Sequence, residues 1–250
     1  MNKDSIIFFL DRYLKINTIK DNSCNGLQVE GADRIERIGL AVDACMETFV
    51  KAKSEKCQMV ICHHGIIWNG LTHIKGYIYK QIKFLIENKI NLYVAHLPLD
   101  IHPVVGNNIQ LIKMLNLKKT KPFGNLHGIL LGYGGSFDSP LSIEELKKII
   151  EKKLNTKSIL LPFGPEKIQK VAIISGGGYK ELEQAIEERY DCYITGEPSH
   201  SNYHIALENR INVIYAGHYA TETPCVKAIG KILENKFKIK TIFLDTPTTI

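Results

Sequence analysis

The sequence predicts an α/β protein made of two intertwined α/β repeats, with mixed, largely parallel sheets covered by helices. Two observations predict this class. Apolar runs of strand length alternate with stretches of helical period, an order typical of parallel sheets with helices on their faces. The same order of runs then occurs a second time in the chain. At 250 residues the chain is long enough for one large domain or two of ordinary size.

Three pairs of segments carry the repeat and keep their order. The pairs are RIGLAVD at 37–43 with KVAIISG at 170–176, CQMVICHH at 57–64 with DCYITGEP at 191–198, and ENKINLYVAH at 87–96 with ENRINVIYAG at 208–217. The offsets are 133, 134 and 121 residues (170 − 37, 191 − 57 and 208 − 87), so the first copy holds about thirteen extra residues, which we place at 68–80. The expected repeats are residues 1–122 and 123–250.

Helices are expected before and between the strands. The apolar residues 6–10 lie between two aspartates and are too few for a signal peptide or a membrane span. We interpret them as the buried face of a first helix that extends to Leu14. The segments at 78–88 and 178–190 have helical period and follow strands of the two copies.

Two further helices are predicted from their first residues. In the segment 142–154, Ser142 can serve as N-cap, and Glu145 three residues later completes a capping box. Towards the C-terminus, Thr223 as N-cap and Pro224 at N1 predict the start of another helix.

The composition is that of a globular protein, because 44% of the residues are hydrophobic and 23% are charged. The six cysteines form no C-x-x-C pair, so we expect free thiols in a cytoplasmic protein without a membrane association. The net charge of +6 comes mostly from scattered lysines, which are typical of a solvated surface and less often of a polyanion site.

Polar residues gather at the carboxyl ends of the predicted strands, where ligands bind in open α/β sheets. Each of these residues alone is more often an ordinary loop or cap residue. Together they form a set of imidazoles and carboxylates, ligands that suit Zn, Fe, Mn or Ni. Five ligands exceed the number that one catalytic zinc takes, so we expect two divalent ions, with the diverging neighbours of the histidine pair on different ions. The predicted ligands are His63, His64, Asp100, His218 and Glu222.

Charge predicts the kind of substrate. Two divalent ions and the carboxylates of Asp100 and Glu222 leave a surplus of positive charge, because neutral imidazoles add none. Such a centre would attract an anionic small molecule such as a phosphate and would lower the pKa of bound water towards roughly 7.

Other residues near the strand ends could assist. His96 either orients a ligand or passes a proton, or is an ordinary strand-end histidine. Glu197 and His200 are expected to line the substrate pocket, with Glu197 as a second candidate for proton transfer. A glycine run between a strand and a helix could cradle a phosphate, although a tight turn explains it equally well. This run consists of Gly176, Gly177 and Gly178.

Five segments resemble the signature segments of the NIF3 family, also named the GTP cyclohydrolase I type 2 or DUF34 family. They are DNSCNGLQVEG at 21–31, ICHHG at 61–65, AHLPLD at 95–100, YITGEPSH at 193–200 and AGHYATE at 216–222. The resemblance implies a dinuclear metal centre held by the same five residues and a homohexameric ring. One departure is Gly65, because the family usually has a proline after the histidine pair.

The resemblance implies an activity less specifically. It suggests a metal-dependent hydrolase that opens the purine ring of GTP or acts on another nucleotide-like substrate. The alternatives are a hexameric protein that binds nucleic acid, whose affinity would fall steeply with salt, and a metal carrier without turnover. The sequence shows no helix-turn-helix, zinc-finger or aromatic RNA-binding motif.

Overall fold

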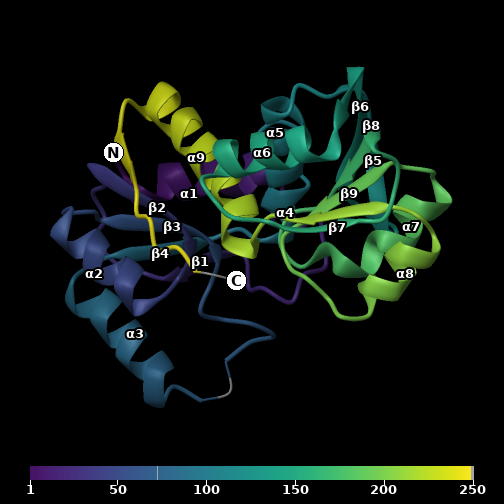
Figure 1. Cartoon of the computed structure of the whole chain (residues 1–250). Coiled ribbons are helices and arrows are strands. Elements are labelled where there is room, and N and C mark those ends of the chain that lie inside the picture. Colours follow the sequence, from purple (N-terminus) through teal and green to yellow (C-terminus); the bar gives the residue numbers. More distant parts are fainter. Residues whose placement is uncertain (72, 249–250) are drawn as a thin grey trace. The chain divides into compact units, whose positions relative to one another are not determined.

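The computed structural model describes residues 1–71 and 73–248 (Figure 1). The chain divides into two compact units. Unit 1 comprises Met1–Val105 and Cys225–Thr246, and unit 2 comprises Gly106–Pro224 with a short stretch from Pro247. The division expected between residues 122 and 123 would cut through a strand of unit 2, so the units separate earlier. The C-terminal segment completes unit 1, which is therefore built from two separate parts of the chain.

Unit 1 contains a five-stranded sheet with the order β1-β4-β3-β2-β11. Its edge strand β1 pairs antiparallel with β4, and the other neighbours are parallel. The strands are β1 (Gly26–Val29), β2 (Arg37–Asp43), β3 (Met59–His64), β4 (Asn91–Val94) and β11 (Lys240–Phe243). Its helices are α1 (Lys3–Leu14), α2 (Met46–Ser54), α3 (Gly76–Glu87) and α4 (Leu97–Asp100), together with the part of α9 (His218–Phe237) from Cys225 onward.

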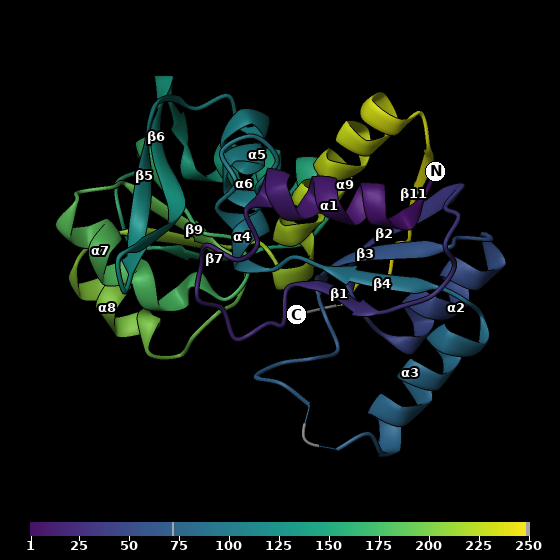
Figure 2. The same ribbon diagram turned by 180° about the vertical axis from the view of Figure 1, so that it is seen from behind.

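Helices cover both faces of the unit 1 sheet (Figures 1 and 2). Met59 and Ile61 of β3 pack with α1 and α9, whereas the alternate residues Val60 and Cys62 pack with α2 and α3. Because successive strand residues point to opposite faces, a strand buried on both faces needs a continuous apolar run. The run from Met59 to Cys62 meets this requirement and leads directly into the two histidines.

The first helix confirms the expectation for the N-terminal segment. Asn2 caps it by accepting a hydrogen bond from the backbone N–H of Asp4. Ile6, Leu10 and Leu14 recur every fourth residue and are buried in the core of unit 1.

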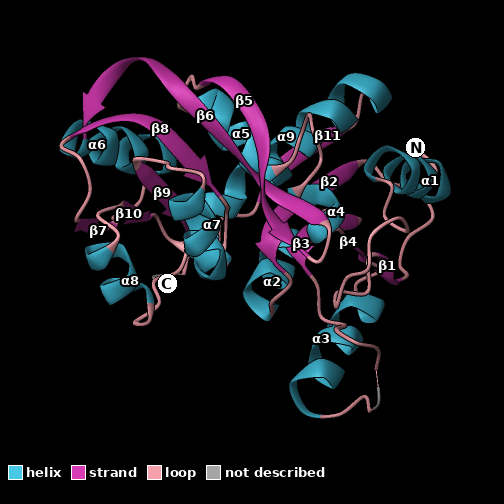
Figure 3. Cartoon of the chain, turned by 90° about the vertical axis from the view of Figure 1, so that its right-hand side faces the viewer, coloured by secondary structure: helices cyan, strands magenta, loops and turns pink. Residues whose placement is uncertain are grey.

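Unit 2 contains a six-stranded sheet with the order β5-β6-β8-β9-β10-β7. Three of its neighbouring pairs are antiparallel and two are parallel, so this sheet is mixed. Its strands are β5 (Lys118–Leu126), β6 (Ile129–Ser142), β7 (Ile159–Pro162), β8 (Lys167–Ile173), β9 (Cys192–Thr195) and β10 (Asn212–Tyr215). Figure 3 shows β5 and β6 as a long curved hairpin.

Helices also cover the two faces of the unit 2 sheet (Figure 1). Leu111 of α5 and Leu146 of α6 pack with Val171, Ile173 and other strand residues in one core. The helices of this unit are α5 (Asn107–Met114), α6 (Ile143–Leu154), the 3₁₀ helix η1 (Gly178–Glu181), α7 (Leu182–Glu187), α8 (Asn202–Glu208) and the first residues of α9. The prediction of a duplicated α/β fold with mixed sheets is therefore confirmed.

The insertion expected at 68–80 lies in unit 1, before and within α3. That helix has 12 residues, whereas α8, which follows the corresponding strand of unit 2, has 7. Thr72 of this stretch lies outside the described residues.

Two helix starts that the sequence predicted have different outcomes. The capping box of α6 is confirmed, because the backbone N–H of Glu145 donates to Ser142 Oγ and the backbone N–H of Ser142 donates to Glu145 Oε2. The start at Thr223 is wrong, because α9 begins at His218 and Pro224 lies inside it. A proline leaves the carbonyl four residues earlier without its N–H donor. Here Thr223 Oγ1 donates to that carbonyl, of Ala220, at 3.2 Å.

Candidate metal centre

Three imidazoles lie together at the carboxyl ends of β3 and β4 in unit 1. His63 and His64 are the last residues of β3, and His96 follows β4. Each ring offers a nitrogen atom, and these three atoms lie within 4.8 Å of one another. The ring centroids of His63 and His64 are only 4.7 Å apart. The expectation that these neighbours diverge is therefore not met, although both residues belong to β3.

All three rings are oriented in the same way, through Nδ1. The Nδ1 contacts are Ala95 O for His63 at 3.1 Å, Asp43 Oδ1 for His64 at 2.8 Å, and Asp21 Oδ1 for His96 at 2.9 Å. Carbonyl and carboxylate oxygens accept hydrogen bonds, so Nδ1 carries the hydrogen, and the lone pair of the neutral ring is on Nε2. Histidines that bind metals are oriented by this kind of contact.

A carboxylate of unit 1 adjoins one of the three imidazoles, that of His63. Asp100 ends the short helix α4, whose backbone donates from Leu99 and Asp100 to the carbonyl of His96. Its Oδ2 lies 3.3 Å from Nε2 of the fully buried His63. Unit 1 thus presents three nitrogen donors and one oxygen donor from two neighbouring strand ends.

Asp21 holds the loop around His96 in place. Its carboxylate accepts hydrogen bonds from the backbone N–H groups of Ser23 and Leu97 and from Asn25 Nδ2. Burial raises the pKa of Asp21, but the hydrogen bonds from His96, Asn25 and Ser23 outweigh burial and hold this pKa well below its usual range. The residue is therefore a carboxylate at neutral pH.

Asp21 and Asp43 orient two of these histidines, a role that was not predicted from the sequence. Asp43 is the last residue of β2, and its register partner on β3 is His64. Asp43 could have been predicted, because it is a polar residue at the carboxyl end of a strand, like the predicted ligands. Asp21 has no such signal, because it lies in a loop 75 residues before its partner His96.

The glycine at position 65, where the family usually has a proline, has a physical reason. A Cβ atom on Gly65 would lie 2.4 Å from Gln28 Nε2, so the side chain of Gln28 occupies this space. Gln28 Oε1 accepts hydrogen bonds from the backbone N–H groups of Ile66 and Ile67. Glycine therefore lets Gln28 fasten the loop that follows the histidine pair.

Unit 2 brings His218, Glu222 and Glu197 together. His218 is the first residue of α9, and Glu222 lies one turn later, with 3.0 Å between His218 Nε2 and Glu222 Oε2. His218 Nδ1 lies 2.6 Å from Glu197 Oε1. Burial lowers the pKa of His218, but hydrogen bonds and charges of both glutamates outweigh it and raise the pKa of His218 to about 9.

The glycine run lies against this pair. Gly176 has a φ of +63°, and a Cβ there would lie 2.1 Å from Glu222 Oε1. The backbone N–H of Gly176 donates to Thr221 Oγ1 at 3.0 Å, so this donor already has a protein acceptor. Gly178 begins η1, and Gly177 lies near Glu197.

His200 is placed differently from the other predicted residues. It is exposed and lies in the turn before α8. The residues that unit 2 gathers around His218 do not include it.

The donor chemistry of both units fits divalent transition metals. Imidazole nitrogens and carboxylate oxygens suit Zn, Fe, Mn and Ni, and the Nδ1 contacts already fix the rings. Among the described residues, no helix combines the length and the apolar character required to cross a membrane. Fold and residues together define a duplicated α/β protein with candidate metal-binding groups.

Comparisons with known proteins agree with this class. The family model Duf34/NIF3 (NGG1p interacting factor 3) matches residues 1–249, and the chain belongs to this family. A GTP cyclohydrolase 1 type 2 homolog of Pyrococcus abyssi is 48% identical over 249 residues, which are 99% of both chains. The homolog of the same name in Pyrococcus horikoshii is 46% identical, again over 99% of both chains. The crystal structure of TTHA1606 from Thermus thermophilus superposes with a TM-score of 0.93 at 36% identity, covering 100% of both chains.

Proposed function

We propose that the protein is a metal-dependent hydrolase that acts on a nucleotide-like substrate, with GTP as the first candidate. One observation carries the proposal: three imidazoles in unit 1, each oriented through Nδ1, lie together, and one of them, that of His63, lies beside the carboxylate of Asp100. The name of the Pyrococcus relatives supports GTP as the substrate to test first.

The proposed metal ligands are those expected from the sequence, and they would hold two divalent ions. They are His63, His64, Asp100, His218 and Glu222. Bound divalent metal supplies Lewis acidity and lowers the pKa of water, so that hydrolysis can proceed at neutral pH. Both units offer nitrogen and oxygen donors for this purpose.

His96 is the proposed proton acceptor. Its Nδ1–H donates to the carboxylate of Asp21, which leaves Nε2 to take a proton from the attacking water. The negative charge of Asp21 would stabilise the imidazolium that forms. The short contact between Glu197 and His218 favours an orienting role for Glu197 over the proton transfer expected from the sequence. Gly177, Gly178 and His200 remain the proposed contacts for a substrate phosphate.

Turnover of GTP by metal-loaded protein tests the proposal. His63→Ala and His218→Ala should each lower turnover by at least about two orders of magnitude, because each removes a proposed metal ligand. His204→Ala is a matched control, since His204 is exposed on α8 and should leave turnover unchanged. Turnover that survives both ligand substitutions would exclude the metal mechanism.

The homohexamer and the association with nucleic acid stay predictions that rest on the family resemblance. Light scattering of the purified protein measures the first. A salt titration of binding to duplex DNA measures the second, because affinity that comes from phosphate contacts falls linearly on a log-log plot.

A further inference from the structure

A basic pocket lies at the amino ends of the strands of unit 1. Its volume is about 560 Å³, and it opens beside the first residues of β2 and β11 and the end of α9. Five cationic side chains line it: Arg34, Arg37, Lys56, Lys238 and Lys240. The candidate metal ligands of unit 1 lie at the opposite, carboxyl ends of the strands.

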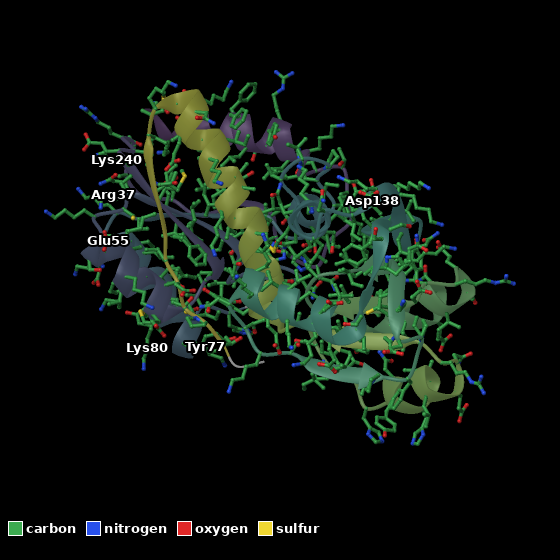
Figure 4. The ribbon with its side chains drawn as sticks, turned by 45° about the horizontal axis from the view of Figure 1, so that its top comes forward. Arg37, Glu55, Tyr77, Lys80, Asp138 and Lys240 are labelled. Carbon is green, nitrogen blue, oxygen red and sulfur yellow. The ribbon has the colours of Figure 1, made fainter. Side chains whose placement is uncertain are left out.

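Two of these cations are direct neighbours across a pair of strands. Arg37 and Lys240 are the first residues of β2 and β11 and are register partners in this parallel pair. Figure 4 shows them at one end of unit 1, with Glu55 beside Arg37. Like charges placed opposite each other on neighbouring strands are unfavourable. An anion bound between them would remove this cost.

The carboxylates nearby neutralise only two of the five cations. Glu55 Oε2 lies 3.1 Å from Arg37 Nη1, and Glu36 Oε1 lies 3.1 Å from Arg34 Nε. Over residues 1–71 and 73–248, no ion pair is formed by the three lysines that line the pocket. These lysines are Lys56, Lys238 and Lys240. A net charge of about three positives therefore faces the pocket, which favours a ligand with several negative charges.

The pocket also has an apolar wall. Phe237 lines it together with Ile35 and Ile239, both of which belong to the core of unit 1. Its volume falls within the range of sites for small molecules, which combine apolar walls with a few charged groups. A single-stranded nucleic acid usually needs an extended basic groove with exposed aromatic rings. The concave shape and the single aromatic wall favour a small ligand.

We propose that this pocket binds a small molecule that carries two or more phosphate groups. Lys56, Lys238 and Lys240 would contact the phosphates, and the ring of Phe237 would pack against any organic part. Arg37 and Asp43, the partner of His64, are the first and last of the 7 residues of β2. At about 3.3 Å per residue the two lie about 20 Å apart, so the pocket is a second site that does not depend on the proposed hydrolase.

Isothermal titration calorimetry on the full, metal-loaded chain tests the pocket. The probes are ADP and inorganic tripolyphosphate, and the expected dissociation constants are roughly micromolar at low salt. Replacing the three lysines (Lys56→Gln, Lys238→Gln and Lys240→Gln) should weaken binding by at least about tenfold, because charge-assisted contacts are lost. Tighter binding of ADP would identify a nucleotide as the ligand, and tighter binding of tripolyphosphate an inorganic polyphosphate.

A second set of lysines provides the matched control. Lys80→Gln, Lys153→Gln and Lys157→Gln change the net charge equally at exposed positions outside the pocket and should change affinity less than about twofold. Thermal melts confirm that both triple variants are folded. Equal weakening by the two sets would overturn the proposal, and so would unchanged binding in the pocket variant.

The proposed metal centre could itself bind phosphates, so the pocket substitutions are also tested in a variant that lacks two of the proposed metal ligands. In the double variant His63→Ala and His218→Ala, the three pocket substitutions should still weaken binding of both probes. If neither probe binds to this double variant, the phosphates bind at the metal centre and the pocket proposal is overturned. If GTP turnover is lost but both probes still bind, the proposed function fails at the metal centre and the pocket proposal stands. Preference for a 30-nucleotide single strand over both probes would also overturn it.

Discussion

The sheets of unit 1 and unit 2 have the same central arrangement of strands but differ in the side chains at their carboxyl edges. Each unit has three consecutive parallel neighbours, β4-β3-β2 in unit 1 and β10-β9-β8 in unit 2. Each also has an antiparallel strand on the outer side, β1 on β4 and β7 on β10. The duplication that the sequence predicted therefore extends to strand order and direction.

Equivalent asparagines show how closely the scaffolds agree. Asn91 begins β4, accepts a hydrogen bond from the backbone N–H of Gly31, and donates to two carbonyl oxygens. Asn212 begins β10, accepts from the backbone N–H of Gly164, and also donates to two carbonyls. A Cβ on either glycine would lie 2.6 Å from backbone atoms, so both loops approach their strands too closely for a side chain.

The chemistry differs where the scaffolds agree. His63 and His64 end β3, whereas Gly196 and Glu197 follow β9. Unit 1 thus offers several imidazoles with Asp100, and unit 2 offers one imidazole between two glutamates. Side-chain contacts to the backbone are therefore alike in the two repeats, while the side chains at the strand ends differ.

Removing the asparagine in each unit tests the equivalence of the scaffolds and has the largest expected effect. Asn91→Ala and Asn212→Ala should each lower the free energy of unfolding by about 3 kcal/mol, because each leaves one backbone N–H and one backbone carbonyl without a partner. Urea unfolding measures both. Asn209→Ala, at an exposed helix end, should cost under about 1 kcal/mol. A large cost in only one unit would break the equivalence.

Glycine substitutions separate the two carboxyl edges. Gly176→Ala should cost about 2 kcal/mol, because its φ is positive and the new Cβ would meet Glu222 Oε1. Gly65→Ala should lower the free energy of unfolding by about 1 kcal/mol less than Gly176→Ala does, since the obstructing amide of Gln28 belongs to a flexible side chain. Chemical denaturation of both variants gives the difference. Equal costs would show that the edge of unit 2 is no tighter than that of unit 1.

The carboxylates that orient histidines should matter in both units. Asp21→Asn and Glu197→Gln keep the shapes of these side chains but remove their charges, and each should weaken metal binding about tenfold, or about 1.4 kcal/mol. Competition with a chelator measures the affinity. Asp138→Asn is the matched control, at an exposed position of β6 that Figure 4 shows. Loss of affinity in the control alone would contradict the orienting roles.

The raised pKa of His218 gives unit 2 a pH dependence. In metal-free protein, His218 should titrate near pH 9 by NMR, because its imidazolium is held by Glu197 and Glu222. A folded pKa above the unfolded value of about 6.5 adds stability that is complete below pH 6.5 and is lost as pH rises through about 9. Metal must displace this proton, so affinity should fall as pH drops below 9. In Glu197→Gln the midpoint should move lower, and an unmoved midpoint would contradict the cause.

Much of the fold could be predicted because it depends on local pattern. Ile6, Leu10 and Leu14 mark the first helix by their spacing, and Ser142 with Glu145 marks α6. The start of α9 was not predicted, because a threonine followed by a proline is typical of the first residues of a helix. Here the hydroxyl of Thr223 compensates for the missing N–H of Pro224 inside the helix. The expected unit boundary lies inside the long hairpin of β5 and β6, which belongs wholly to unit 2.

The candidate site was predictable to the extent that it follows strand ends. His63, His64 and Asp100 in unit 1, like His218 and Glu222 in unit 2, come after recognisable apolar runs. Asp21 could not be predicted, because its role depends on a loop that folds back onto His96.

Metal content of the purified protein tests most directly whether both units supply ligands to two ions. Elemental analysis and native mass spectrometry should find two divalent ions per chain, and His63→Ala and His218→Ala should each lower this number. Wild-type protein that binds no metal, or a His218→Ala variant that keeps both ions at full affinity, would contradict the proposed set of ligands.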